Sequence, residues 1–307
     1  MTFDPKRDIP DLDGKVILIT GGTGGLGAWC VVQLAQRNPA QIYFTGRNSK
    51  SADAVIKRVT DSGSRAAVQF IKCDLTSLAS VKAAADQILS EQSRLDVLMA
   101  NAGIMNHPPG LTKDGYEVQF GTNHLSHALF IKKLLPLMEQ TATLPGADPR
   151  IVILTSTGFR STPSGGVKFK ELKTTQDAPV LGGALRYGQS KLANLLYAQE
   201  LAQRYPSITS VSVTPGIVGT DLVNSQSGVN KAVIWLAAKL GQGGITKPED
   251  GTASQLWCSV GPKDEVVNGE FYEPVGKICK VSTKYTKDRS LAKQLWEWTQ
   301  AELEKWQ

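Results

Sequence analysis

The chain has 307 residues, which is enough to bury a large core in one extended α/β domain or in two smaller ones. Hydrophobic residues make up 41% and charged residues 20%, so disordered, collagen-like and coiled-coil classes are excluded. The net charge of +6 comes from lysines and arginines that are scattered without a basic stripe, and we therefore expect no nucleic-acid partner.

The cysteines and the polar start of the chain indicate its environment. Cys30, Cys73, Cys258 and Cys279 lie far apart without CxxC spacing, so we expect reduced, packed thiols. The start, MTFDPKRDIPDLDGK, has no signal-peptide core, and no run reaches the roughly 18 apolar residues of a membrane span. These features predict a cytoplasmic protein with no transmembrane segment.

Short apolar runs alternate with longer helical patterns, which is typical of βαβ units and a parallel sheet. We expect strands at 15–20, 41–46, 66–74, 95–103, 150–156 and 208–216, with a seventh at 269–274. Helical patterns lie near 26–38, 49–62, 77–92, 112–140, 185–205 and 248–260. Continuous apolar strands need helices on both faces, so the sequence predicts an α/β fold: a single doubly wound Rossmann-type domain with about seven parallel strands.

Ligands bind such sheets at the carboxyl ends of the strands. The stretch VILITGGTGGLG, residues 16–27, turns from a strand into a helix through five glycines. Glycines let the backbone approach a pyrophosphate, and the following helix presents unpaired N–H groups to it. A plain tight turn is the alternative, because a glycine cluster alone is weak evidence.

Further polar and small residues end the next strands. Asp74 could accept an adenine amino proton, although an aspartate there is more often a helix cap. Asn101, Ala102 and Gly103 form either a close backbone approach to a cofactor or an ordinary turn. Gly46 and then Arg47 stand where NAD-binding units usually carry an acidic residue, and an arginine can pair with a 2′-phosphate. We therefore expect NADP(H) in preference to NAD(H), with a plain surface arginine as the alternative.

Tyr187 and Lys191 lie four residues apart on a predicted helix and share one face, and Ser156 ends a strand. A phenol holds its proton at neutral pH and can donate it to a developing alkoxide. A neighbouring Lys⁺ and an oxidised nicotinamide would lower the pKa of that phenol, so we expect Tyr187 to be a general acid/base tuned by Lys191. Alone, such a pair is more often an ordinary helix surface.

The motifs TGGTGGLG, CDLTS, NAG, GTNHLSH, ILTST, YGQSK and TPGIVGT occur in this order. In them the chain resembles the short-chain dehydrogenase/reductase family over nearly its whole length. The stretch DGYEVQFGTNHLSHALF and the long gap between Ser156 and Tyr187 are similar to the branch that contains retinol dehydrogenases.

The resemblance implies catalytic roles for Asn123, Ser156, Tyr187 and Lys191. Ser156 would hold the substrate oxygen, and Lys191 would hold the nicotinamide ribose. Asn123 would hold a water in a proton relay to Lys191. The alternative for Asn123 is an amide that bends or caps its helix. Thr155 is expected only to pack. The implied cofactor contacts are Thr20, Gly21, Thr23, Gly25, Leu26, Gly27, Arg47, Asp74, Leu75, Asn101, Ala102, Gly103, Tyr187, Lys191, Pro215, Gly216, Ile217 and Thr220.

The resemblance divides the domain into a cofactor half, about residues 14–150, and a catalytic half, 151–307, with a substrate lid at about 221–247. The lid segment has an apolar helical stripe, which favours a hydrophobic ketone, aldehyde or secondary alcohol, although the stripe could equally pack on the core or on a partner subunit. A homo-oligomer is compatible with the sequence.

Other functions are less well supported. His124 and His127 share a helix, but two histidines without a third ligand make a poor zinc site, so we expect no metal. No GxSxG motif is present, which weakens a hydrolase assignment. A cofactor-binding regulator without turnover is the alternative function, and it would have no physical need to retain all four catalytic side chains.

Overall fold

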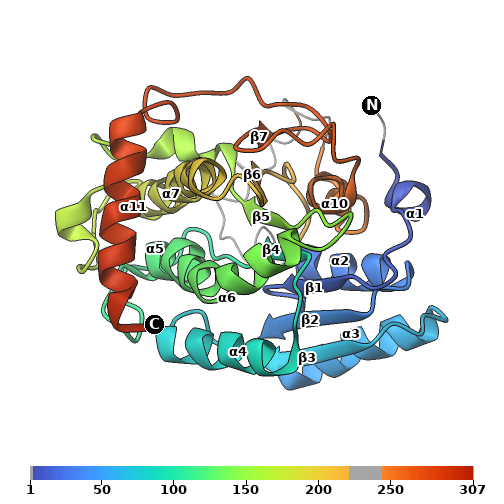
Figure 1. Cartoon of the computed structure of the whole chain (residues 1–307). Helices are drawn as coiled ribbons and strands as arrows, with labels where there is room; N and C mark the ends of the chain where they lie inside the picture. The colour runs from blue at the N-terminus through green and yellow to red at the C-terminus, as the bar shows by residue number, and fades with distance from the viewer. Residues whose placement is uncertain (1–2, 221–238, 240–243, 307) are drawn as a thin grey trace.

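A computed structural model describes residues 3–220, 239 and 244–306 (Figure 1). Seven strands form one sheet in the order β3-β2-β1-β4-β5-β6-β7, and every neighbouring pair is parallel. The doubly wound parallel sheet expected from the sequence is confirmed. The strands are β1 (Val16–Ile19), β2 (Gln41–Gly46), β3 (Val68–Lys72), β4 (Val97–Ala100), β5 (Arg150–Leu154), β6 (Thr209–Val213) and β7 (Phe271–Tyr272).

Helices cover both faces of the sheet (Figure 1). The α-helices are α1 (Pro5–Asp8), α2 (Gly25–Ala35), α3 (Ser49–Asp61), α4 (Leu78–Glu91), α5 (Val118–Phe120), α6 (Ser126–Ala142), α7 (Gly182–Arg204), α10 (Ala253–Val260) and α11 (Arg289–Leu303). Short 3-10 turns are η2 (Thr157–Ser161), η3 (Phe169–Glu171), η4 (Asp250–Thr252) and η5 (Glu304–Trp306), whereas η1 (Gly121–Leu125) is a π turn.

The continuous apolar run of β1 follows from this double covering. Val16 and Leu18 pack with α4 and α6 on one face, whereas Ile17 and Ile19 pack with α2, α3 and α10 on the other. Successive side chains of a strand point to opposite faces, so a strand buried on both sides needs apolar residues at every position.

The helix expected at 112–140 is divided in the structure. Gly115 has a φ of +82°, which belongs to a turn and not to a helix. The side chain of Glu117 then accepts from the backbone N–H of Phe120, and the π turn η1 separates α5 from α6. The apolar pattern at 112–140 therefore did not reveal that the first helix begins only at Val118, nor that a π turn follows it.

Helix α11 was not predicted from the sequence. Asp288 caps its N-terminus by accepting from the N–H of Leu291 at 3.0 Å, and the helix packs on α7 (Figure 1). The segment 157–184, expected to be irregular, contains η2 and η3. Of the expected lid, only residues 239 and 244–247 are described, so that prediction lies mostly outside the described residues.

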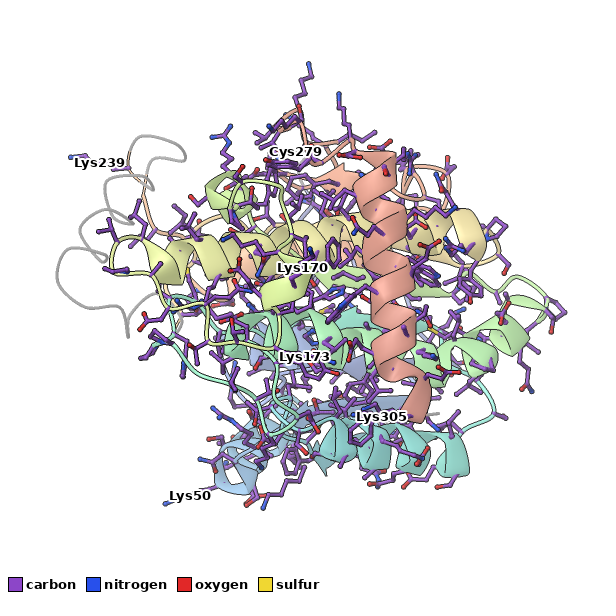
Figure 2. The ribbon with its side chains drawn as sticks, turned by 90° about the vertical axis from the view of Figure 1, so that its left-hand side faces the viewer. Lys50, Lys170, Lys173, Lys239, Cys279 and Lys305 are labelled. Atoms are coloured by element: carbon purple, nitrogen blue, oxygen red, sulfur yellow. The ribbon has the colours of Figure 1, made fainter. Side chains whose placement is uncertain are left out.

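All four cysteines are free thiols, and three of them are buried, as expected. Within the described ranges, no helix is long and apolar enough to cross a membrane. Three of the lysines labelled in Figure 2 come from separate elements: Lys50 from α3, Lys170 from η3 and Lys305 from the C-terminal turn η5. This distribution agrees with the scattered charge seen in the sequence.

Asp96 fixes the amino-terminal edge of the sheet. Its buried carboxylate accepts from the N–H of Val16 at 3.0 Å and from Arg94 at 2.9 and 2.6 Å, and it pairs with Lys15 at 3.2 Å. We expect Asp96→Ala to lower the free energy of unfolding by about 2 kcal/mol, because it leaves the buried N–H of Val16 and the partly buried Lys15 and Arg94 without their acceptor. Urea unfolding measures this loss. Asp61→Ala, which removes the exposed pair with Lys57, is the control and should cost at most about 1 kcal/mol; equal losses in the two variants would contradict the assignment.

Candidate active site

The loop between β1 and α2 brings backbone N–H groups to the carboxyl edge of the sheet. Gly21 and Gly25 have φ angles of +67° and +51°, which favour glycine. Helix α2 has Gly24 as its N-cap, and no described side chain caps it. A Cβ on Gly27 would lie 2.6 Å from the Asn101 amide nitrogen, so only glycine fits there. Uncapped N–H groups at the start of an 11-residue helix fit a phosphate group.

The end of β4 is tied to the end of β1. The Thr20 hydroxyl accepts from the N–H groups of Asn101 and Ala102 at 2.9 and 3.0 Å, and the Asn101 amide donates to the Thr20 carbonyl at 2.8 Å. A Cβ on Gly21 would lie 2.9 Å from the Cβ of Ala102. The NAG turn therefore packs directly against the glycine loop.

The end of β2 meets the same loop. A Cβ on Gly46 would lie 2.5 Å from the Thr23 hydroxyl oxygen, so the two segments are in close contact. Arg47 follows as an exposed residue, and no carboxylate in the described ranges pairs with it. A cavity of about 350 Å³ is lined by Thr23, Gly24 and Gly25, by α3 and by Thr220.

Asp74 is not the cap of α4, because that role belongs to Ser77. Its carboxylate accepts from the N–H and hydroxyl of Thr76 at 3.0 and 2.8 Å and pairs with Lys113 at 2.9 Å. Partial burial opposes ionisation, but the Lys113 and Thr76 bonds outweigh it and lower the pKa of Asp74. The neighbouring Leu75 is partly buried against the core.

Asn123 lies fully buried in the π turn η1. Its amide oxygen accepts from the N–H of Ile104 at 2.8 Å, and its amide nitrogen donates to the Ile104 carbonyl and to the Ser190 hydroxyl, each at 2.9 Å. A Cβ on Gly103 would lie 3.2 Å from the Asn123 amide oxygen and 3.5 Å from the Lys191 ammonium. The structure therefore brings Gly103, Asn123 and Lys191 together.

Helix α7 presents Tyr187 and Lys191 toward the end of β5. The Lys191 ammonium donates to the Leu154 carbonyl at 3.0 Å and lies 5.7 Å from the centre of the Tyr187 ring. Thr155 was expected only to pack, but its hydroxyl donates to the Lys191 carbonyl at 2.6 Å. This bond fastens α7 to the strand end.

Ser156 and Tyr187 meet across Gly158. A Cβ on Gly158 would lie 3.2 Å from the Ser156 hydroxyl oxygen and 2.9 Å from the Tyr187 ring, so Gly158 permits this approach. The Gly158 N–H donates to the Ser156 hydroxyl oxygen at 3.0 Å, which orients that oxygen.

Burial controls the protonation states of Tyr187 and Lys191. It raises the pKa of Tyr187 to about 12, against the opposing hydrogen bond with Ser156, and it lowers the pKa of Lys191 to about 8. In the protein alone, loss of water around the phenol dominates. The lowering expected from Lys191 together with an oxidised nicotinamide stays a prediction. Tyr187 holds its proton at neutral pH.

The segment after β6 lies against the glycine loop. Gly216 follows Pro215 with a φ of +77°, and the Ile217 carbonyl accepts from the N–H of Thr246 at 3.1 Å. The methyl group of Thr220 would lie 3.4 Å from a Cβ on Gly25. Thr220 therefore reaches the start of α2.

A buried ion pair beside Tyr187 was missed in the sequence. Arg186 pairs with Glu117 at 3.2 Å and donates to the carbonyls of His107 at 2.8 Å and Gln176 at 3.1 Å. It therefore fastens the segments after β4 and before α7 to the helix that carries Tyr187. The only signal for this pair in the sequence is that each of the two charged residues lies among apolar residues.

The two histidines expected on one helix lie in consecutive elements, His124 in η1 and His127 in α6, and both bond to protein groups. His124 lies 3.3 Å from the Asn194 amide oxygen and 3.2 Å from the Thr299 hydroxyl, and His127 contacts Asn123 and Thr20. In the part of the chain that the structure describes, no group of three or more potential ligands could hold a metal ion.

Comparison with known proteins agrees with this geometry. Residues 15–166 match the family model of short chain dehydrogenases. An uncharacterised oxidoreductase of Schizosaccharomyces pombe is 37% identical, with 88% of this chain and 80% of that protein covered. Human retinol dehydrogenase 11 is 32% identical, with 93% and 85% covered.

Solved structures agree as well. An uncharacterised protein from Mycobacterium paratuberculosis has a TM-score of 0.73 at 26% identity, with 98% and 97% of the two chains covered. A blue fluorescent protein from a metagenomic library, in complex with NADPH, has a TM-score of 0.66 at 25% identity, with 87% and 98% covered. The chain belongs to the short-chain dehydrogenase/reductase family of NAD(P)-dependent oxidoreductases.

Proposed function

We propose that the chain is an NADP(H)-dependent oxidoreductase that transfers a hydride between the nicotinamide and a hydrophobic ketone, aldehyde or secondary alcohol. The observation that carries this proposal is the meeting of Ser156, Tyr187 and Lys191 at the end of β5, beside the NAG turn and the glycine loop. When bound, the reduced nicotinamide supplies a hydride to the carbonyl carbon.

Tyr187 is the proton donor to the carbonyl oxygen in this proposal. Its raised pKa keeps the phenol protonated at neutral pH, which suits reduction. Ser156 lies against the Tyr187 ring across Gly158, where its hydroxyl can donate to the same oxygen and orient it. Lys191 is charged below its pKa of about 8 and stabilises the phenolate left after proton transfer. Asn123 holds a water in a proton relay to Lys191.

The residues around the glycine loop would hold the cofactor. The first N–H groups of α2 bind its pyrophosphate, and Arg47 binds the 2′-phosphate that distinguishes NADP(H) from NAD(H). The exposure of Arg47 and its lack of an acidic partner among the described residues support this preference. Asp74 would accept a hydrogen bond from the adenine amino group, as expected from the sequence.

The hydrophobic substrate is supported by the apolar residues that recur in the sequence segment 221–247 and by the name of the human relative, retinol dehydrogenase 11. A screen of NADPH consumption over hydrophobic ketones, aldehydes, quinones and polyketide-like ketones tests the substrate class. The cytoplasmic location and a homo-oligomer stay predictions.

We expect Tyr187→Phe to lower kcat by at least about 100-fold, because the general acid is removed. The dissociation constant of NADPH should stay nearly unchanged. Tyr197→Phe is the matched control, since Tyr197 is a second buried tyrosine of α7 and accepts a hydrogen bond from Gln300 at 3.3 Å. Undiminished turnover in Tyr187→Phe would refute the mechanism.

We expect Arg47→Ala to raise the dissociation constant of NADPH by about 10-fold or more, because a charged hydrogen bond to phosphate is lost. The affinity for NADH should change little, as measured by cofactor fluorescence. Lys50→Ala, at a second exposed cation near the start of α3, serves as the control (Figure 2). Equal losses for both cofactors would remove the argument for a phosphate contact.

Lys191→Met should lower turnover and stabilise the fold. Burial moves the pKa of Lys191 from 10.5 to about 8, and at about 1.4 kcal/mol per pKa unit this corresponds to a gain of up to about 3 kcal/mol in the variant. Below pH 8 the buried lysine is charged and the full cost is present. The cost disappears as the pH rises toward 10.5, where the lysine is neutral in both states.

Thermal unfolding at about pH 7 and about pH 10 measures this difference. The stabilisation by Lys191→Met should be large at the lower pH and small at the higher pH, whereas Lys170→Met, at an exposed lysine, should have little effect at either. Destabilisation at the lower pH would show that the buried ammonium is not a cost to the fold.

A further inference from the structure

His127 bridges two parts of the site that are far apart in the sequence. It is 2% exposed, in the first turn of α6. Its Nδ1 lies 2.9 Å from the backbone carbonyl oxygen of Asn123, and its Nε2 lies 2.8 Å from the hydroxyl oxygen of Thr20. One imidazole thus connects the π turn to the end of β1.

The chemistry of the partners fixes the tautomer of His127. A carbonyl oxygen only accepts, so Nδ1 must carry the proton. A neutral imidazole has one N–H, so Nε2 accepts and the Thr20 hydroxyl donates to it. Burial lowers the pKa of His127 to about 4, with a smaller contribution from the charge of Lys191, so the ring is neutral at physiological pH.

The bridge continues to the end of β4. The Thr20 hydroxyl gives its proton to His127 at 2.8 Å and not to the Met99 carbonyl, which lies at the longer distance of 3.5 Å. Its oxygen accepts from the N–H groups of Asn101 and Ala102 at 2.9 and 3.0 Å. Each donor in this chain has an acceptor. Because the bonds are buried, a missing member would leave its neighbours unpaired at a substantial cost.

We propose that His127 is a positioning residue that holds the backbone of Asn123 in register with Thr20, Asn101 and Ala102. This inference rests on the proposed function, in which Asn123 belongs to the catalytic set and the NAG turn and glycine loop face the cofactor. Both ring nitrogens of His127 are used by protein groups, so we assign it no direct contact with a reactant. It acts through the π turn and the two strand ends that it joins.

The first test needs no turnover. Nitrogen NMR of the cofactor-free protein, with the His127 ring signals assigned through His127→Gln, reports which ring nitrogen carries the proton. The bridge requires a protonated Nδ1 and an unprotonated Nε2 at neutral pH. A protonated Nε2 would overturn it.

The second test compares variants that break or retain the bridge. We expect His127→Leu and Thr20→Val each to lower kcat by about 10- to 100-fold, since small displacements of catalytic groups have effects of this size. The KM for the carbonyl substrate should change less than kcat, and the dissociation constant of NADPH should rise. His127→Gln should recover most of the loss, because its amide can donate to Asn123 and accept from Thr20.

Thr141→Val is the matched control for Thr20→Val. Thr141 is also fully buried, lies in the last turn of the same helix α6, and accepts from the N–H of Leu95 at 2.8 Å. The Thr141→Val variant should lose stability by a similar mechanism. Its kcat and its affinity for NADPH should stay near the wild-type values. Equal kinetic losses in both threonine variants would reduce the role of the bridge to general stability.

The double variant Thr20→Val/His127→Leu separates one bridge from two independent effects. Losses in kcat and in NADPH affinity should not exceed those of the worse single variant, because both substitutions break the same chain of bonds. Losses that multiply, or a His127→Leu variant with wild-type values, would refute the proposal. If no carbonyl is reduced by the wild type, the proposed function fails, whereas the ring tautomer and NADPH affinity still decide the bridge.

Discussion

The site depends on one buried ammonium group. Lys191 belongs to helix α7, and its buried ammonium group has lost most of its water and donates to the Leu154 carbonyl. Burying a charge is costly, and few sequences retain one without a function for it. The surrounding bonds, from Thr155 to the Lys191 carbonyl and from Asn194 to the Leu154 carbonyl, fix the helix and the strand end around that charge.

The parallel sheet explains why so many separate segments reach this charge. All strands end at the same edge, so the segments after β1, β4, β5 and β6 converge there. Small residues permit the convergence: Gly27 against Asn101 and Gly158 against Tyr187 leave no room for a side chain, and Gly103 lies close to Asn123 and Lys191. The opposite, amino-terminal edge of the sheet is held by Asp96.

The sequence predicted the features that leave a local pattern. All seven strands and the helices between them are present, because apolar runs buried on two faces differ clearly from amphipathic helices. Features that depend on distant partners were not predicted. The Glu117–Arg186 pair joins residues that are far apart in the sequence, and the raised pKa of Tyr187 comes from burial. The π turn at Asn123 left no recognised pattern in the sequence. Helix α11 did have a local signal, the cap at Asp288, which was not recognised.

The most direct measurement of the proposed chemistry follows the hydride itself. NADPH carrying deuterium at its transferable C4 position is incubated with the protein and the best ketone from the screen, and the product is examined by mass spectrometry and NMR. The account predicts one deuterium on the carbinol carbon and none on the oxygen-bound position. Binding of NADPH without any transfer of deuterium to a carbonyl compound would contradict it and would favour a cofactor-binding regulator.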